Sequence, residues 1–153
     1  MSFFDWIGKI LSEYFLQFLK GTGYTLVMAI AGTLIGFIIG LAIAVVRTIP
    51  TEKGTKPVKR VLLKIVNVIL NVYIEVMRGT PMLVQALIIH YSLFAKMNME
   101  PLLSAIIIIF INTGAYMAEI VRGGIISVDK GQFEGAQALG MTHFQAMIRI
   151  ILP

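Results

Sequence analysis

Residues 24–46 read YTLVMAIAGTLIGFIIGLAIAVV and contain no charged side chain. An α-helix of this length extends roughly 34 Å, which exceeds the hydrocarbon core of a bilayer, about 30 Å. The stretch therefore predicts a membrane-spanning helix. Gly32, Gly36 and Gly40 recur at every fourth position and so share one face of that helix. They predict close contact with a second helix, although glycine is also generally frequent in membrane helices.

The composition of the whole chain agrees with an all-α integral membrane protein. Of its 153 residues, 58% are hydrophobic and only 14% are charged, against roughly 25% charged residues in soluble domains. The absence of cysteine excludes disulfides, thiolate metal sites and a cysteine nucleophile. The net charge of +5 comes from basic residues at the ends of apolar runs. This pattern indicates contact with a lipid bilayer, and we expect no nucleic-acid partner.

Two further spans are expected, at about 76–95 and 101–121.

Residues 1–20 place apolar side chains at helical spacing with charged residues between them. They predict a separate interfacial amphipathic helix. They do not resemble a signal peptide, because they lack a basic start, an unbroken apolar stretch and a small-residue cleavage site.

Residues 61–95 are too many for one ordinary span, and we expect a break within them. The Gly79-Thr80-Pro81 sequence predicts a bend, since proline lacks a backbone donor and disfavours helical geometry at the preceding residue. The helix before this bend should carry one polar stripe, because its polar residues are spaced three or four apart. These residues are Lys64, Asn67, Asn71, Glu75 and Arg78.

The distribution of Lys and Arg predicts the orientation. Six lie in residues 47–64, and Arg122, Lys130 and Arg149 follow the last expected span, whereas Lys9, Lys20 and Lys96 fall on the other side. By the positive-inside rule the N-terminus lies outside, and residues 122–153 are cytoplasmic.

The C-terminal segment predicts a short helix, a turn and a second helix, with Gly140 supplying the positive φ that ends the first. A short exposed helix on the cytoplasmic side could dock a soluble partner. An ordinary surface loop fits the spacing equally well.

The pattern Glu134-Gly135-Ala136-x-x-x-Gly140-x9-Ile150-x-Leu152-Pro153 resembles the EAA loop of permease subunits from ATP-binding-cassette (ABC) importers, with glycine in place of the first alanine. Residues 75–85 (EVMRGTPMLVQ) and 114–124 (GAYMAEIVRGG) are similar to the polar amino-acid branch of that superfamily, which includes histidine, glutamine and arginine importers. The resemblance extends from about Gly21 to Pro153.

The resemblance implies a type I ABC importer transmembrane domain over residues 21–153, with about three spans and an EAA or coupling segment at 122–153. It implies a bacterial inner-membrane location and three kinds of partner: a second permease chain in a homo- or heterodimer, two ATP-binding subunits and an extracytoplasmic solute-binding protein. Glu134, Gly135, Ala136 and Gly140 would couple the permease to the ATPase. ATP and Mg would bind on the partner, because this sequence contains no GxxxxGK[ST] phosphate loop. We expect no cofactor and no enzymatic activity in this chain.

Permeases of this kind usually continue through about two more helices after the Leu-Pro pair, so the chain is expected to be a partial permease. Two hypotheses remain. The first is a transport subunit for polar amino acids. The second is a truncated membrane protein that does not transport and has a structural or regulatory role on intact permeases.

Eight polar residues within or directly beside the expected spans are candidates for a function. The pairs Glu75 with Arg78 and Glu119 with Arg122 are three apart, which predicts structural ion pairs. The deeper residues could contact a polar solute, or could hold helices together by hydrogen bonds. These residues are Gln85, His90, Asn112 and Thr113.

No metal site is expected, because His90 and the only other histidine, His143, should lie on opposite sides of the membrane. An intramembrane enzyme is disfavoured as well, since no nucleophile, base and orienting group occur at matched spacing.

Overall fold

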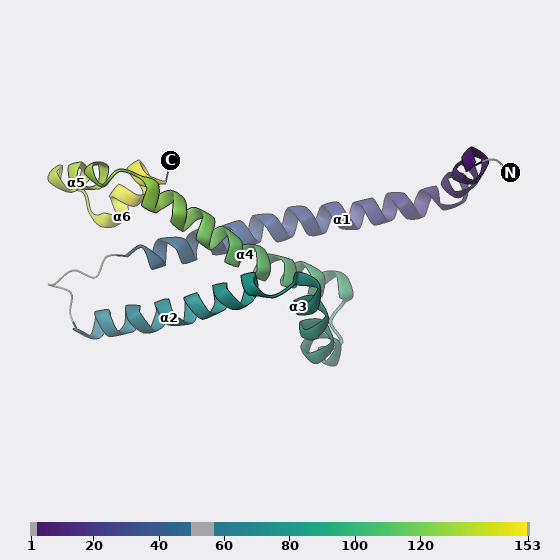
Figure 1. Ribbon diagram of the computed structural model, residues 1–153, viewed down its shortest axis with the longest axis horizontal. Helices are drawn as coiled ribbons and strands as arrows, with labels where there is room; N and C mark the ends of the chain where they lie inside the picture. Colours follow the sequence, from purple (N-terminus) through teal and green to yellow (C-terminus); the bar gives the residue numbers. More distant parts are fainter. Residues whose placement is uncertain (1–2, 50–56, 153) are drawn as a thin grey trace.

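The computed structural model describes residues 3–49 and 57–152, which are helical apart from short connections and contain no strand. In chain order the elements are α1 (Phe3–Arg47), α2 (Pro57–Gly79), α3 (Met82–Ile89), a π-helical turn η1 (His90–Phe94), a 3₁₀ turn η2 (Ala95–Met97), α4 (Pro101–Ser127), α5 (Lys130–Ala138), α6 (His143–Ala146) and a second π-helical turn η3 (Met147–Ile151) (Figure 1). The all-α class expected from the sequence is confirmed.

The helices α1 and α4 cross in close contact (Figure 1). The buried residues of α1 are Gly32, Gly36, Gly40 and Ala44, one face repeating every fourth residue. A Cβ added at Gly36 would lie 2.7 Å from Cβ of Thr113, and one added at Gly40 would lie 2.5 Å from Cβ of Met117. The predicted glycine contact is therefore confirmed, and its partner is α4.

A small core forms where α1, α2 and α4 meet. Ile74 of α2 packs with Ala115 and Ala118 of α4, and Ile43 of α1 lies against this cluster. Tyr73 of α2 adds a polar link, since its hydroxyl donates to a backbone carbonyl of α4. Ala115 and Ala118 have small side chains, so the larger side chains of α1 and α2 can pack close to α4.

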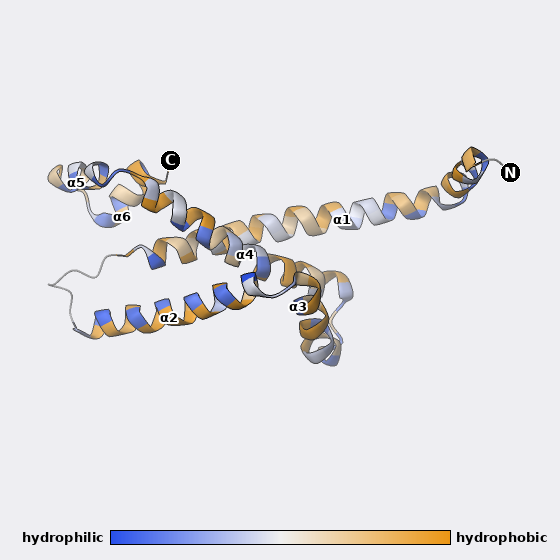
Figure 2. Ribbon diagram, viewed as in Figure 1, coloured by the Kyte–Doolittle hydropathy of each residue, from blue (hydrophilic) through white to orange (hydrophobic). Residues whose placement is uncertain are grey.

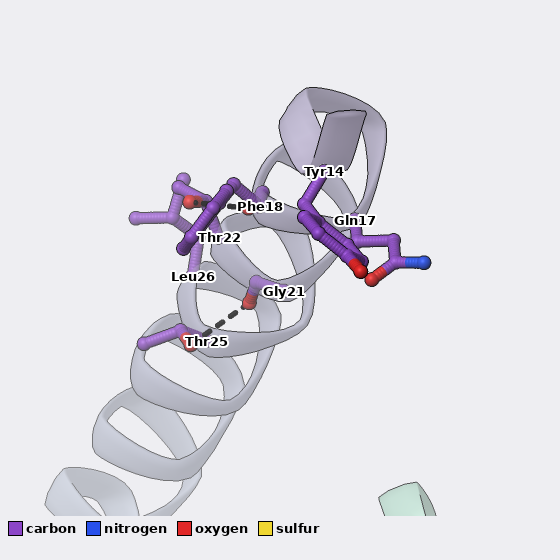
Figure 3. A pocket seen from close by; sticks show the side chains of 7 residues that line it. All are labelled: Tyr14, Gln17, Phe18, Gly21, Thr22, Thr25 and Leu26. Carbon is purple, nitrogen blue, oxygen red and sulfur yellow. Dashed lines mark hydrogen bonds between the residues drawn. The ribbon is translucent and has the colours of Figure 1, made fainter. Parts of the chain in front are cut away.

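The separate helix expected over residues 1–20 is wrong as an element, because α1 is continuous for 45 residues, about 68 Å at 1.5 Å per residue. Gly21 and Gly23 lower helix propensity without breaking the helix, since no proline accompanies them. Figure 3 shows Thr22 donating from Oγ1 to the carbonyl of Phe18, at 2.9 Å, within this unbroken helix. All the side chains drawn there belong to α1, and residues 3–27 of this helix are exposed. An interfacial location for it stays a prediction.

The predicted bend at Gly79-Thr80-Pro81 is confirmed. The helix α2 ends at Gly79, Pro81 has extended geometry (φ −61°, ψ 131°), and α3 begins at Met82. Residues 76–79 belong to α2, so the expected span at about 76–95 contains this bend, and its bounds stay a prediction. Figure 2 shows the predicted polar stripe as a hydrophilic side running along α2.

Two helices, α1 and α4, are long and apolar enough to cross a membrane, and Met82–Met97 forms a shorter apolar helical segment. Only 22% and 33% of the most apolar windows of α1 and α4 are buried, unlike the core helices of a soluble protein. α4 continues to Ser127, so the expected coupling segment at 122–153 begins inside this helix.

Figure 1 places the end of α1, the start of α2, the end of α4 and both C-terminal helices at one end of the molecule. These are the parts that the charge distribution assigns to one side of the membrane. Lys53 and Lys56, which contributed to that prediction, and Pro153 of the EAA pattern lie outside the described residues. The orientation itself stays a prediction.

We expect Gly36→Leu to destabilise the helix pair, because the new side chain would overlap Thr113. Overpacking of this kind typically costs about 1–3 kcal/mol. Thermal unfolding of the detergent-purified protein should show a lowered midpoint. Gly21→Leu is the matched control, since a Cβ there meets nothing within 4 Å. Equal midpoints for the two variants would contradict the packing assignment.

Candidate functional site

The break between α2 and α3 leaves the backbone carbonyl of Met77 without its helical donor. If α2 continued, the N–H of the residue four positions later would donate to this carbonyl, but that residue is Pro81, which has no N–H. Two side-chain amides take its place. Nε2 of Gln85 donates to this carbonyl at 2.8 Å, and Nδ2 of Asn112 donates at 3.3 Å.

These two amides also bind each other, forming what we call the amide junction (Met77, Thr80, Gln85 and Asn112). Nδ2 of Asn112 donates to Oε1 of Gln85 at 2.9 Å, and Nε2 of Gln85 lies 2.6 Å from the Thr80 hydroxyl oxygen. Gln85 and Asn112 are only 7% and 8% exposed. Their geometry supports a role in holding helices together, and direct contact with a solute stays a prediction.

His90 and Thr113 lie apart from this junction. Nδ1 of His90 is 2.9 Å from the Ser104 hydroxyl, which donates its own proton to the Pro101 carbonyl. The serine oxygen must therefore accept, so Nδ1 of His90 carries the proton. Thr113 packs against Gly36 of α1. Of the four residues expected along a substrate path, the structure brings together only Gln85 and Asn112.

An ion network joins three helices at the end where α5 and α6 lie. The predicted pair of Glu119 with Arg122 is formed, at 3.4 Å. Glu119 also pairs with Arg47 of α1, whose Nη2 donates to Oδ1 of Asn71 at 2.6 Å. Sequence reasoning missed Arg47, because spacing along one helix says nothing about a cation on another.

The predicted ion pair of Glu75 with Arg78 is wrong. The guanidinium of Arg78 lies over the ring of Tyr116, 5.5 Å from its centroid. Glu75 is exposed and forms no ion pair within residues 3–49 and 57–152. The side chain of Arg78 points toward α4 because the aromatic face there attracts a cation.

These charged residues line a depression of about 580 Å³ between α1, α2 and α4, which we call the charged groove. Its lining residues are Arg47, Asn71, Ile74, Glu75, Arg78, Gly79, Tyr116, Glu119 and Arg122.

The C-terminal segment has the predicted helix, turn and second helix. Asp129 caps the start of α5 by accepting the N–H of Gly131 at 2.6 Å. Gly140 has φ of 77°, as predicted, and its N–H donates to Gln137 while that of Met141 donates to Ala136. This pair of bonds is a Schellman motif, which ends α5 at a fixed angle. A capping box between Thr142 and Gln145 then starts α6.

The surface of α5 is polar with one large apolar residue beside it. Glu134, Gly135 and Gly140 are exposed, whereas Ala136 is buried at 2% and anchors the helix. Leu139, in the turn, is 82% exposed. The EAA pattern did not single out Leu139, although it lies beside Gly140.

We expect Gln85→Met to destabilise the protein by about 1–3 kcal/mol, since the Met77 carbonyl loses its best donor. Pro81→Ala would restore a backbone N–H four residues after Met77. Combining the two should therefore cost less than the sum of the single changes, which a double-mutant cycle of unfolding free energies measures. Strict additivity would show that the amide does not replace the missing backbone donor.

The chain is similar in sequence and in structure to known membrane transport proteins. A family model described as the inner membrane component of binding-protein-dependent transport systems matches residues 58–153. The chain is 39% identical to the L-cystine transport system permease protein TcyB of Bacillus subtilis, over 79% of this chain and 49% of that protein. It is 35% identical to the glutamine transport system permease protein GlnP of Escherichia coli, over 88% and 58% of the two chains.

A third relative is the probable amino-acid permease protein YxeN of Bacillus subtilis, 38% identical over all of this chain and 64% of that protein. A crystal structure of an amino acid ABC transporter with histidines has a TM-score of 0.66 and 36% identity, covering 91% of this chain and 63% of the other. The chain thus spans between about half and two thirds of the length of these relatives. With its apolar exposed helices and its C-terminal helix pair, this membrane protein belongs to the family of inner membrane components of binding-protein-dependent transport systems.

Proposed function

We propose that this chain is the permease part of an ATP-driven importer of polar amino acids, and that it couples to a separate ATP-hydrolysing subunit through α5. The names of the similar permeases, for L-cystine, glutamine and amino acids in general, support the solute class. The second hypothesis, a regulatory protein that does not transport, has no specific observation in its favour.

The observation that carries the coupling role is the presentation of α5. The helix is capped at its start by Asp129 and ended by the Schellman turn at Gly140, so both ends are fixed by hydrogen bonds. Its Glu134 and Gly135 remain exposed, and Leu139 adds an apolar side chain beside them. A small, rigid, partly apolar surface is suited to insertion into a cleft of a partner protein.

The proposal includes an assembly and an orientation. Two permease chains, identical or related, would surround the translocation path, with two ATP-binding subunits below α5 and a solute-binding protein on the opposite side. ATP and Mg would bind to the ATP-binding subunits. The N-terminus would lie outside, and α5 with α6 would lie in the cytoplasm.

We expect Glu134→Trp to reduce both ATPase retention and amino-acid uptake by about tenfold or more, because the bulky ring would stand between α5 and its partner. The permease and its ATPase are co-expressed, purified by a tag on the permease, and tested for bound ATPase and for uptake in proteoliposomes. The matched control is Gln17→Trp, since Gln17 is also an exposed glutamine on a helix but lies in the N-terminal half of α1, far from α5.

Normal ATPase retention and uptake by Glu134→Trp, at equal membrane levels, would rule out coupling through this face. An equal loss with Gln17→Trp would indicate that an added tryptophan acts through general misfolding, which also contradicts a specific docking face on α5.

A further inference from the structure

The charged groove holds charges that the ion network leaves unsatisfied. Its lining contains three guanidinium groups and two carboxylates, so one positive charge is in excess. Glu119 is shared by Arg47 and Arg122. The remaining charged residues of the groove, Glu75 and Arg78, have no ion pair in the described part of the chain.

The position of Arg78 leaves its hydrogen-bonding edge available. The guanidinium carbon lies over the Tyr116 ring, 5.5 Å from its centroid, and Arg78 makes no hydrogen bond to the rest of the described residues. The N–H groups of a guanidinium can hold a carboxylate through two parallel hydrogen bonds. Because the tyrosine ring supports the guanidinium, less side-chain freedom is lost on binding.

Glu75 provides the complementary charge one helical turn away. It lies three residues before Arg78 on α2, so both side chains start from the same helix face. Its carboxylate accepts hydrogen bonds only, and an ammonium group is a suitable donor. The groove also has an apolar wall, formed by Ile74 and the Tyr116 ring.

We propose that the charged groove binds the main-chain groups of a free α-amino acid, with Arg78 holding the carboxylate and Glu75 the ammonium. The network of Arg47, Glu119 and Arg122 keeps the three helices in place around it. A volume of about 580 Å³ lies within the usual range for small-molecule sites, roughly 300–1,000 Å³. This inference rests on the proposed function in taking the transported solute as the occupant.

The two groups bound in this assignment, the α-carboxylate and the α-ammonium, are present in all free α-amino acids with a primary amine. Binding should therefore require both main-chain charges and depend little on the solute's side chain. The site would act after a solute has entered the permease, at the end of the helices where α5 lies (Figure 1).

The test uses the complete permease and ATPase complex in lipid nanodiscs, without a solute-binding protein, and radiolabelled L-glutamine as the probe. Unlabelled L-glutamine, L-histidine and L-alanine should compete with similar strength. N-acetyl-L-glutamine, which lacks the ammonium group, and L-glutaminamide, which lacks the carboxylate, should each compete at least about tenfold less well, as expected for a lost charge-assisted contact.

Arg78→Gln and Glu75→Gln should each weaken L-glutamine binding by about tenfold or more. Lys64→Gln is the matched control, because it removes a charge from the same stripe of α2 outside the groove, and it should leave binding unchanged. Unchanged binding by both groove variants, or no binding to the unaltered complex, would overturn the proposal. Loss of complex assembly in size-exclusion chromatography, with L-glutamine binding intact, would also overturn it and identify the groove as a subunit interface.

Uptake by the unaltered transporter in proteoliposomes separates this inference from the function on which it rests. If the complete transporter, supplied with its solute-binding protein and ATP, takes up no amino acid, the proposed function fails. If uptake occurs but the groove variants bind L-glutamine normally, only the groove assignment fails.

Discussion

The close approach of α1 and α4 is the constraint on which the rest of the structure depends. Gly32, Gly36, Gly40 and Ala44 present almost no side chain on the contact face, so the two backbones meet directly. In a membrane no hydrophobic force drives helices together, and close packing must supply the attraction. The same approach brings Arg47, the last residue of α1, to Glu119. The ion network and the charged groove therefore exist because the glycine face allows α1 to reach α4.

A second constraint comes from one missing hydrogen atom. Pro81 cannot donate to the carbonyl of Met77, and an unsatisfied backbone group in an apolar environment is costly. Gln85 and Asn112 supply the replacement, and in doing so they tie α2, α3 and α4 together. Considered one at a time, polar residues within apolar helices suggest a path for a solute. The hydrogen bonds of Gln85 and Asn112 show that these two residues also satisfy the backbone at the bend.

The helix α4 connects the main features of the molecule. It meets α1 through the glycine face, meets α3 through Asn112, contributes Glu119 and Arg122 to the charged groove, and leads to α5 through Val128 and Asp129. A partner bound at α5 would thus lie one helix away from the groove. Under the proposed function, this arrangement gives a short structural path between ATP hydrolysis on the partner and the solute.

The sequence by itself determined the features that depend on local chemistry: the apolar span, the glycine face, the bend at Pro81, the polar stripe of α2 and the turn at Gly140. Each follows from composition, helical period or backbone geometry within a few residues. Only the tertiary structure decided which charges meet. Spacing along the chain favoured an ion pair of Glu75 with Arg78, yet Arg78 lies over Tyr116. Glu119 pairs with Arg47 of α1, which precedes it by 72 residues in the sequence. The energy of such contacts depends on distance in space, and helix crossing sets that distance.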